Sequence, residues 1–424
     1  MISTGGDAGV RGKALLLTVA LCFLLFWSGL GFGSNMSDVR YWVDSTRMMI
    51  WLEWAFIVLY LSIVRNLSAF SVLWKRHRLN ADLALLWGVA VVLSYLFSPY
   101  YGWQNILAQL RLFETFTHAL FFFMLWDAFQ RYNIDYRWLF AALIASTLIV
   151  LVYFVYIHFS YPQLRADSHV FSIRSEQLLL NTHLHRIGYQ VATVLILLTA
   201  FLSTGKRGLL VLSVMTVLLL FMFWLGGRAA LLGTAVALLF YVYLVRNGIS
   251  IKRAFLPFVL PAVIMVAAVY FQWVDTGYIV NAFQKTFLAG SLEGMMTGRY
   301  EVWGLAFEKL EGHWLLGTGP QSYFFYPQRH AEVIHAHNFI LQFLGEWGIL
   351  GTVPALLLLL RGLRYGMQMH GQMTADARAL HRSAGLAMLA LGVMALFGGI
   401  FFFHQTELYF MLLMAVWITP LKQA

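Results

Sequence analysis

The sequence predicts an all-α polytopic membrane protein, and three observations lead to this prediction. Hydrophobic residues make up 60% of the 424 residues and charged residues only 11%, whereas a soluble domain carries about 25% charged residues. The apolar residues gather in runs long enough to cross a bilayer, which takes about 20 residues of helix. The Lys and Arg residues, which give a formal net charge of +10, stand in short clusters between these runs. That distribution is typical of cytoplasmic loops and argues against a nucleic-acid partner.

Counting the apolar runs predicts about twelve transmembrane helices in a single integral membrane domain over residues 1–424. The first run covers about 14–32, and no clear cleavage site follows it, so we expect an uncleaved span. Cys22, the only cysteine, lies inside this run, which excludes a disulfide framework. The runs begin near residues 14, 48, 82, 104, 138, 187, 208, 229, 254, 337, 383 and 404.

The basic loops predict the orientation. With the N-terminus inside, every short loop on the cytoplasmic side is basic, as the positive-inside rule requires. These loops are 75–78, 131–137, 206–207, 246–253 and 361–382. An even number of spans preserves the alternation, so we expect both termini in the cytoplasm.

Two longer segments fall on the opposite, outer face: 161–186, and the much larger 272–336 between the ninth and tenth spans. Loops longer than about 12–15 residues are usually functional or disordered, and the second segment is too rich in aromatic residues for disorder. Within it, four apolar residues recur at helical spacing and predict an amphipathic helix on the membrane surface. They are Tyr300, Trp303, Phe307 and Leu310. Gly312 and the segment 317–320 predict the exit from this helix and a turn.

Two arginines at the outer boundary are candidates for binding an anion. Arg228 follows two glycines between two closely joined spans, and its guanidinium group offers a bidentate fork to phosphate. The alternative is an arginine that extends to lipid headgroups. Arg299 falls at the start of the surface helix, where unpaired N–H groups already favour an anion.

A second basic cluster in the smaller outer loop is a weaker candidate for the same role. It consists of Arg174, His183, His185 and Arg186.

His337 and Asn338 open the tenth run, and His335 stands two residues earlier. His337 is a candidate general base because the pKa of an imidazole lies near ambient pH; His335 is its rival. The alternative is a capped helix start with an interfacial histidine. Asn338, together with Gln342 and Glu346, forms one polar stripe that should face the bundle interior. Glu346 lies about 13 Å from His337 by helical rise, so we expect it to be an interior structural partner, for example of an arginine.

Other polar residues inside the spans are expected to be internal contacts. Arg111, Glu114 and His118 share one face of the fourth span and predict an internal ion pair. The remaining residues of this kind, expected to make interior polar contacts, are Glu53, His404 and Glu407.

A metal centre is not expected from the sequence, and no cofactor is predicted. The outer face offers only scattered carboxylates, with neither an Asp-x-Asp pair nor a His-x-x-x-His pair. They are Asp167, Glu176, Asp275 and Glu293. Two or more arginines could instead neutralise a diphosphate without a cation.

Four blocks in order resemble the O-antigen ligase and polymerase superfamily over about 209–354, a third of the chain. The blocks are Gly226–Gly233, Thr297–Trp303, Trp314–Pro320 and His337–Gly351. Gly227 stands where the family more often has a serine before the arginine.

The resemblance implies a GT-C-like glycosyltransferase in the inner membrane of a Gram-negative bacterium, with a large periplasmic loop that carries short amphipathic helices. It implies metal-independent, inverting transfer from an undecaprenyl-diphosphate-linked O-antigen on the periplasmic face. By position, His337 resembles the residue that activates the acceptor hydroxyl, and Arg228 and Arg299 resemble the groups that bind the diphosphate.

Length and the single large outer loop favour the ligase, whose acceptor is lipid A-core oligosaccharide. A polymerase of O-antigen or exopolysaccharide that uses the same donor remains an alternative. A flippase for polyprenyl-linked glycans is the alternative from another class, and it predicts inverted repeats, which the sequence does not show.

Overall fold

The computed structural model describes residues 5–30, 48–64, 78–160, 184–203, 208–245, 298–327, 334–370 and 373–420, together with 259, 263 and 267. All regular structure within these residues is helical. The first half of the chain contributes α1 (Gly5–Leu30), α3 (Met48–Ile63), α5 (Arg78–Leu96), α6 (Ile106–Arg131), α7 (Tyr136–Ser160) and α8 (Leu184–Ser203). The second half contributes α9 (Gly208–Leu225), α10 (Arg228–Val245), α14 (Arg299–Leu310), the short 3₁₀ helix η2 (Ser322–Phe325), α15 (Phe339–His370), α16 (Ala375–Ala395) and α17 (His404–Trp417).

These helices coincide with all but one of the predicted apolar runs. The run near residue 254 falls largely outside the described residues. Six of the described helices are long and apolar enough to span a membrane, and α3 and α10 contain shorter apolar stretches. The protein is therefore a helical membrane protein, while the total of twelve spans stays a prediction.

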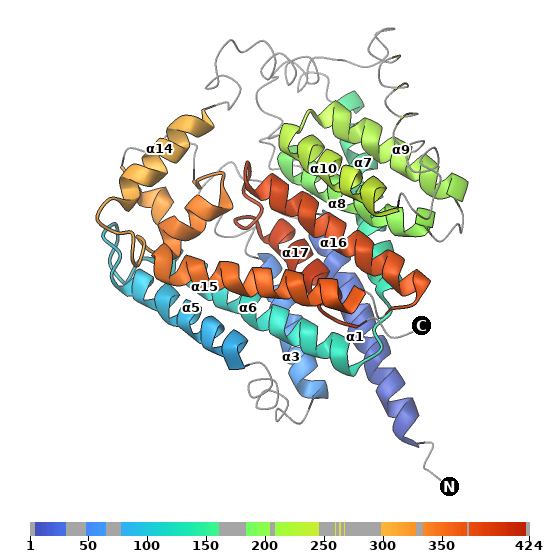
Figure 1. Cartoon of the computed structure of the whole chain (residues 1–424), viewed down its shortest axis with the longest axis horizontal. Coiled ribbons are helices and arrows are strands. Elements are labelled where there is room, and N and C mark those ends of the chain that lie inside the picture. Colours follow the sequence, from blue (N-terminus) through green and yellow to red (C-terminus); the bar gives the residue numbers. More distant parts are fainter. Residues whose placement is uncertain are drawn as a thin grey trace.

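The helices pack into a bundle in which several neighbouring helices come from distant parts of the sequence (Figure 1). The N-terminal α1 packs on α7, α5 lies along α15, and α16 lies between α8 and α10. One apolar core extends through α1, α3, α6 to α10, α16 and α17. A second, small core lies under α14 and is formed by Val302, Ala306, Tyr323, Ala336 and Leu341. In Figure 1, α14 lies on the opposite side of the molecule from α9.

The predicted amphipathic helix is present as α14, with two of its aromatic residues on the outer side. Tyr300 and Phe307 are 63% and 49% exposed, whereas Val302 and Ala306 are buried against the start of α15. Small side chains let two helices approach closely, and the aromatic rings are left on the outer side. The prediction of the helix is therefore confirmed, and its place on the membrane surface stays a prediction.

The tenth predicted span begins two residues later than expected, at Phe339, and it is not continuous. Gly348 has φ 59° and ψ −169°, so α15 consists of two helical parts joined at this residue. A side chain at Gly348 would place its Cβ 2.4 Å from the amide nitrogen of Gly317. Only glycine fits this position, because the φ value is left-handed and another backbone lies in contact.

The loop after α14 supplies the hydrogen bonds that the break removes from α15. The amide of Ile349 donates to the carbonyl of Trp314 at 2.9 Å, and the amide of Thr318 donates to Gly345 at 2.7 Å. In an unbroken helix Ile349 would donate to Gly345, so the loop takes over both halves of that bond. The break thus joins residues 314–318 to the middle of α15, and α14 is held beside the first part of α15.

A candidate active site at the start of α15

The turn before α15 is fixed by Asn338. Its side-chain oxygen accepts hydrogen bonds from the amides of Ile340 at 2.9 Å and Leu341 at 3.2 Å, which is the bonding of a helix N-cap. Its side-chain nitrogen donates to the carbonyl of Leu396 at 3.3 Å. The structure therefore gives Asn338 a capping role, and the expected role in binding substrate stays a prediction.

His337 and His335 form one unit in this turn. His337 is partly buried with φ 51°, a left-handed value that few residues other than glycine adopt. Its amide donates to Nδ1 of His335 at 3.1 Å, and the two ring centroids are 4.0 Å apart. Strained backbone of this kind is kept where the surroundings over-determine it, often at a functional site.

His335 is the more enclosed of the two histidines. It is 3% exposed, and its ring stacks on Phe402 at a centroid distance of 4.6 Å. A Cβ added to Gly399 would lie 2.7 Å from Cε1 of His335, so the ring rests directly on the glycine backbone. Because Nδ1 of His335 accepts from a backbone amide, the remaining proton of the neutral ring lies on Nε2. His335 is thus held in place, and His337 is the imidazole closer to the surface.

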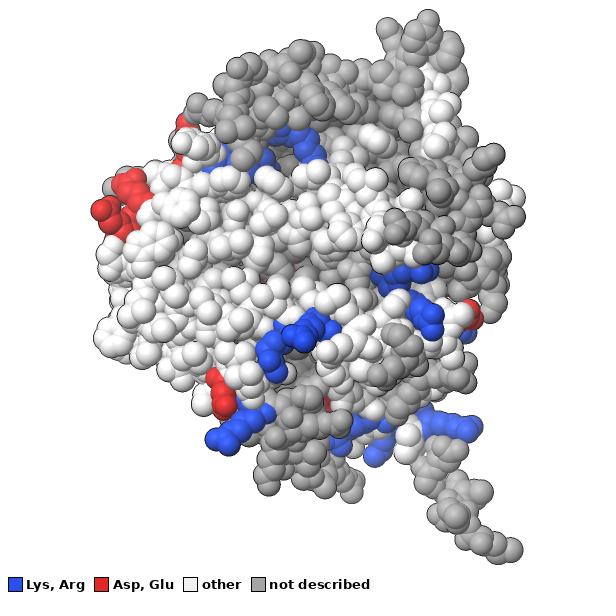
Figure 2. Space-filling model, viewed as in Figure 1, with Lys and Arg blue, Asp and Glu red and all other residues white. Residues whose placement is uncertain are grey.

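Positive charge surrounds His337. Burial, together with the charges of Arg299 and His185, lowers the pKa of His337 to about 3. The pKa of Arg299 is also lowered, by burial and by the charge of Arg228. Arg228 is the first residue of α10, and Arg299 is the first residue of α14. Both arginines were expected to bind an anion. In Figure 2, basic side chains gather between α14 and α10 on the face shown. The structure therefore places Arg299 within electrostatic reach of both His337 and Arg228.

Arg186 lies inside α8 rather than in the outer loop where it was expected. It is 2% exposed, and its guanidinium carbon lies 4.3 Å from the centroid of the Phe403 ring. This spacing is that of a cation–π contact. The other members of the predicted basic cluster are His185, Arg174 and His183. His185 precedes Arg186 in the first turn of α8 and is exposed, whereas Arg174 and His183 lie outside the described residues.

A chain of hydrogen bonds runs from this turn into the bundle. The amide of Ala336 donates to the side-chain oxygen of Gln342 at 3.0 Å, and the side-chain nitrogen of Gln342 donates to Glu346 at 2.5 Å. The other oxygen of Glu346 lies 3.7 Å from Nε of Arg111. The expected interior role of Glu346, with an arginine as its partner, is confirmed. The polar stripe thus links the backbone next to His337 to a buried ion pair.

Arg111 makes the ion pair that the sequence predicted within α6. Its Nη1 lies 3.0 Å from Glu114, and its Nη2 donates to the carbonyl of Phe401 at 3.0 Å. Its guanidinium carbon also lies 5.4 Å from the centroid of the Phe402 ring, on which His335 stacks. Arg111 therefore contacts the ring of Phe402, on which His335 of the turn stacks.

Lys309, on the buried side of α14, extends this polar group. Burial lowers the pKa of Lys309 to about 7, and the negative charge of Glu346 opposes that shift. The ammonium nitrogen also lies 5.5 Å from the centroid of the Tyr323 ring. Lys309 is buried because it lies on the same side of α14 as Val302 and Ala306.

The loop between α16 and α17 is the part of the site that the sequence did not predict. Its glycines let Tyr189 and His335 approach, since a Cβ at Gly398 would lie 2.1 Å from the Tyr189 hydroxyl and one at Gly399 would overlap His335. Its phenylalanines then contact Arg111, Arg186 and His335. A paired glycine before three aromatic residues was the available signal.

One cluster of described side chains has the residue types and spacing of a metal site. The described residues that could together hold a metal ion are Glu53, His118 and His404, which lie on α3, α6 and α17. They were expected to make interior contacts, and each is buried. They are separate from the arginines beside His337.

Comparison with known proteins bears on this arrangement. The family model described as O-Antigen ligase matches residues 213–356, which extend from α9 into α15 and include Arg228, Arg299 and His337. Among curated proteins, none matches the chain. Over this segment, a third of the chain that includes the three candidate site residues, the protein is similar to the O-antigen ligase family.

Proposed function

We propose that this protein transfers O-antigen from undecaprenyl diphosphate to lipid A-core oligosaccharide on the periplasmic face of the inner membrane. The family match supports an activity of the ligase or polymerase type. The observation that carries the finer proposal is the neutral imidazole of His337 beside two arginines that start separate helices.

In this proposal the diphosphate of the donor binds between Arg228 and Arg299. Two guanidinium groups near each other repel, and burial adds to the cost. A dianionic diphosphate relieves both effects, so the site favours this class of ligand. The arginines then stabilise the negative charge that grows on the leaving diphosphate, an effect worth several kcal/mol.

His337 acts as the general base. Its low pKa keeps the ring neutral at pH 7, so a nitrogen is available to accept a proton from an acceptor sugar hydroxyl. When the diphosphate cancels the positive charge of Arg299, the pKa of His337 rises towards its ordinary value, which makes the base stronger when donor is present. The hydroxyl oxygen then attacks the anomeric carbon, the bond to the diphosphate breaks with inversion, and the proton stays on His337. In this scheme the arginines take the place of a metal ion at the diphosphate.

The test is a reconstituted assay with purified donor and acceptor. We expect His337→Gln to lower the rate by about 10²–10⁴-fold and Arg228→Ala or Arg299→Ala to do the same or more. His370→Gln and Arg364→Ala are matched controls at the far end of α15, and they should keep normal rates. Near-normal transfer by His337→Gln would remove the general base from the proposal.

The products separate the ligase from the polymerase. Polymer attached to lipid A-core in the reconstituted assay supports the ligase, whereas longer polymer that stays on the polyprenyl carrier identifies a polymerase. Cells that lack the gene provide a second measure: rough core with accumulated lipid-linked polymer indicates a ligase, and core with one repeat unit indicates a polymerase.

A further inference from the structure

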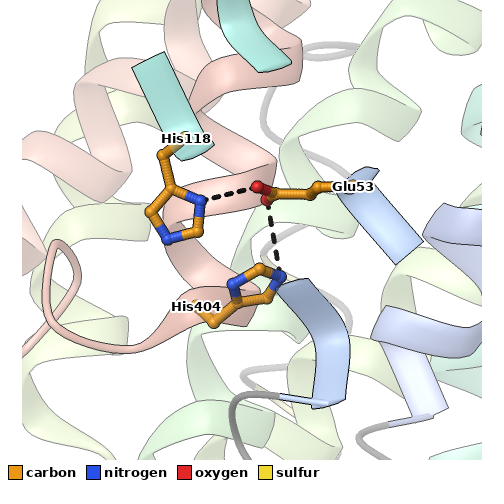
Figure 3. A group of neighbouring side chains, drawn as sticks. All are labelled: Glu53, His118 and His404. Atoms are coloured by element: carbon orange, nitrogen blue, oxygen red, sulfur yellow. Dashed lines mark hydrogen bonds and ion pairs between the residues drawn. The ribbon is translucent and has the colours of Figure 1, made fainter. Parts of the chain in front are cut away.

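Three buried side chains from three helices converge behind the candidate active site (Figure 3). Glu53 of α3, His118 of α6 and His404 of α17 are 0%, 3% and 4% exposed. One oxygen of Glu53 lies 2.8 Å from Nδ1 of His118, and the other lies 3.4 Å from Nε2 of His404. The three ligand atoms all lie within 4.8 Å of one another. Both imidazoles therefore point at one carboxylate inside the bundle.

The carboxylate of Glu53 needs a compensating positive charge, because an isolated ionised group in such a place is costly. Its ionic contacts among the described residues are the two imidazoles. The nearest guanidinium, that of Arg111, is 3.0 Å from Glu114 and 4.0 Å from Glu407. The charge must come either from protons on the imidazoles or from a bound cation.

His404 also has unmet hydrogen-bonding capacity. Within the described part of the chain, neither ring nitrogen of His404 has a hydrogen-bond partner, nor does Oε1 of Glu53. Buried polar atoms are almost always satisfied. A contrast within the same protein is His381, whose Nε2 lies 2.7 Å from the carbonyl of Trp417 and whose Nδ1 lies 3.2 Å from His370. Both ring nitrogens of His381 therefore have hydrogen-bond partners, whereas those of His404 have none among the described residues.

The spacing suits a transition metal. Zinc binds imidazole nitrogen at about 2.0–2.1 Å and carboxylate oxygen at about 2.0–2.2 Å, so tetrahedral ligand atoms are about 3.4 Å apart. The separation between Glu53 and His404 is 3.4 Å. The 2.8 Å separation between Glu53 and His118 would have to open by a few tenths of an ångström.

The second ring nitrogen of His118 faces two carboxylates, although it has no hydrogen-bond partner within the described residues. Its Nε2 lies 3.4 Å from Glu407 and 3.8 Å from Glu114. A histidine that binds a metal through one nitrogen usually donates its other N–H to a carboxylate, which fixes the ring and its tautomer. The carboxylates around His118 can do this while Nδ1 faces the ion.

We propose that Glu53, His118 and His404 bind one divalent transition-metal ion of the zinc class, and that the ion has a structural role. It joins α3 and α6 to the first residue of α17. Because Phe403 precedes His404 and its ring lies 5.3 Å from that of His335, the ion also fixes the loop that supports the histidine turn. The ion takes no part in the chemistry at the diphosphate.

The metal content of the purified protein tests this proposal directly. The full chain is purified without an immobilised-metal step, and its zinc is measured by mass spectrometry. We expect about one zinc per wild-type chain and a loss of at least tenfold in Glu53→Gln and His404→Gln. His370→Gln is the matched control from the second histidine pair and should keep its zinc. Zinc that is lost from His370→Gln instead would overturn the assignment.

Thermal unfolding gives a second measurement that does not depend on the variants. A chelator should lower the Tm of the wild-type protein, and added Zn²⁺ alone should restore it, because an ion that binds only the folded state stabilises it. Glu53→Gln, which keeps the shape of the side chain, should show neither shift. A wild-type protein that carries no transition metal, with a Tm that neither chelator nor Zn²⁺ moves, would show that protons balance Glu53 and that the proposal is wrong.

Discussion

Acidification should destabilise the wild-type protein more than His337→Gln. The pKa of His337 falls from its ordinary value of 6.5 to about 3 because of burial and the charge of Arg299. Between these values the unfolded chain binds a proton at this residue and the folded protein does not, so stability is present above pH 6.5 and is lost as the pH falls. From about pH 7.5 to pH 5 the loss is about 2 kcal/mol, which is 1.5 pH units at about 1.4 kcal/mol each.

The assay is the free energy of unfolding of detergent-solubilised protein at the two pH values, followed by the intrinsic fluorescence of its 15 tryptophans. The variant removes only the contribution of His337, so the other histidines cancel in the difference. Inorganic pyrophosphate should reduce the difference, since an anion between the arginines lets the imidazole accept a proton. Parallel losses in wild type and variant would refute the reasoning, because the pKa of His337 would then not be lowered by burial and by the charge of Arg299.

Three further substitutions test the surroundings of the site through thermal unfolding and transfer rates. Glu346→Leu leaves Arg111 with one partner fewer in a buried place and should cost about 3–5 kcal/mol, whereas Glu346→Gln should cost less because it keeps a hydrogen-bond acceptor. Gly348→Ala should cost about 1–3 kcal/mol from its left-handed backbone alone, with more from the overlap with Gly317; an unchanged Tm would contradict the break in α15. Asn338→Ala should lower stability by about 1 kcal/mol through the lost cap, while a fall in kcat/KM at unchanged Tm would show that Asn338 binds substrate instead.

The sequence predicted the helices and the three central site residues for the same physical reason. Apolar runs have to be helical in a bilayer because every backbone group needs an internal partner. Against that background a charged residue at the outer boundary stands out, and Arg228, Arg299 and His337 were found in this way. The structure places Arg299 near both of the others, although of the 52 residues from 246 to 297 only 259, 263 and 267 are described.

The parts that the sequence could not give depend on contacts between distant segments. That Glu346 would meet Arg111 rather than another arginine follows from the packing of α15 against α5 and α17, which no local pattern encodes. The break at Gly348 is equally non-local, because the hydrogen bonds that permit it come from Trp314 and its neighbours. In α14 no local pattern indicated that Val302 and Ala306 would be the residues buried against the start of α15.

The break in α15 constrains the number of residues between α14 and that helix more strongly than their identity. The groups that bridge the break, from Trp314 to Thr318, use backbone atoms, so most side-chain replacements there leave the bonds in place. Adding or deleting one residue would shift every amide by about 3.5 Å and mismatch donor and acceptor. Arg299 at the far end of α14 would then move relative to His337. The distance between the guanidinium group of Arg299 and the imidazole of His337 therefore depends on the number of residues between α14 and α15.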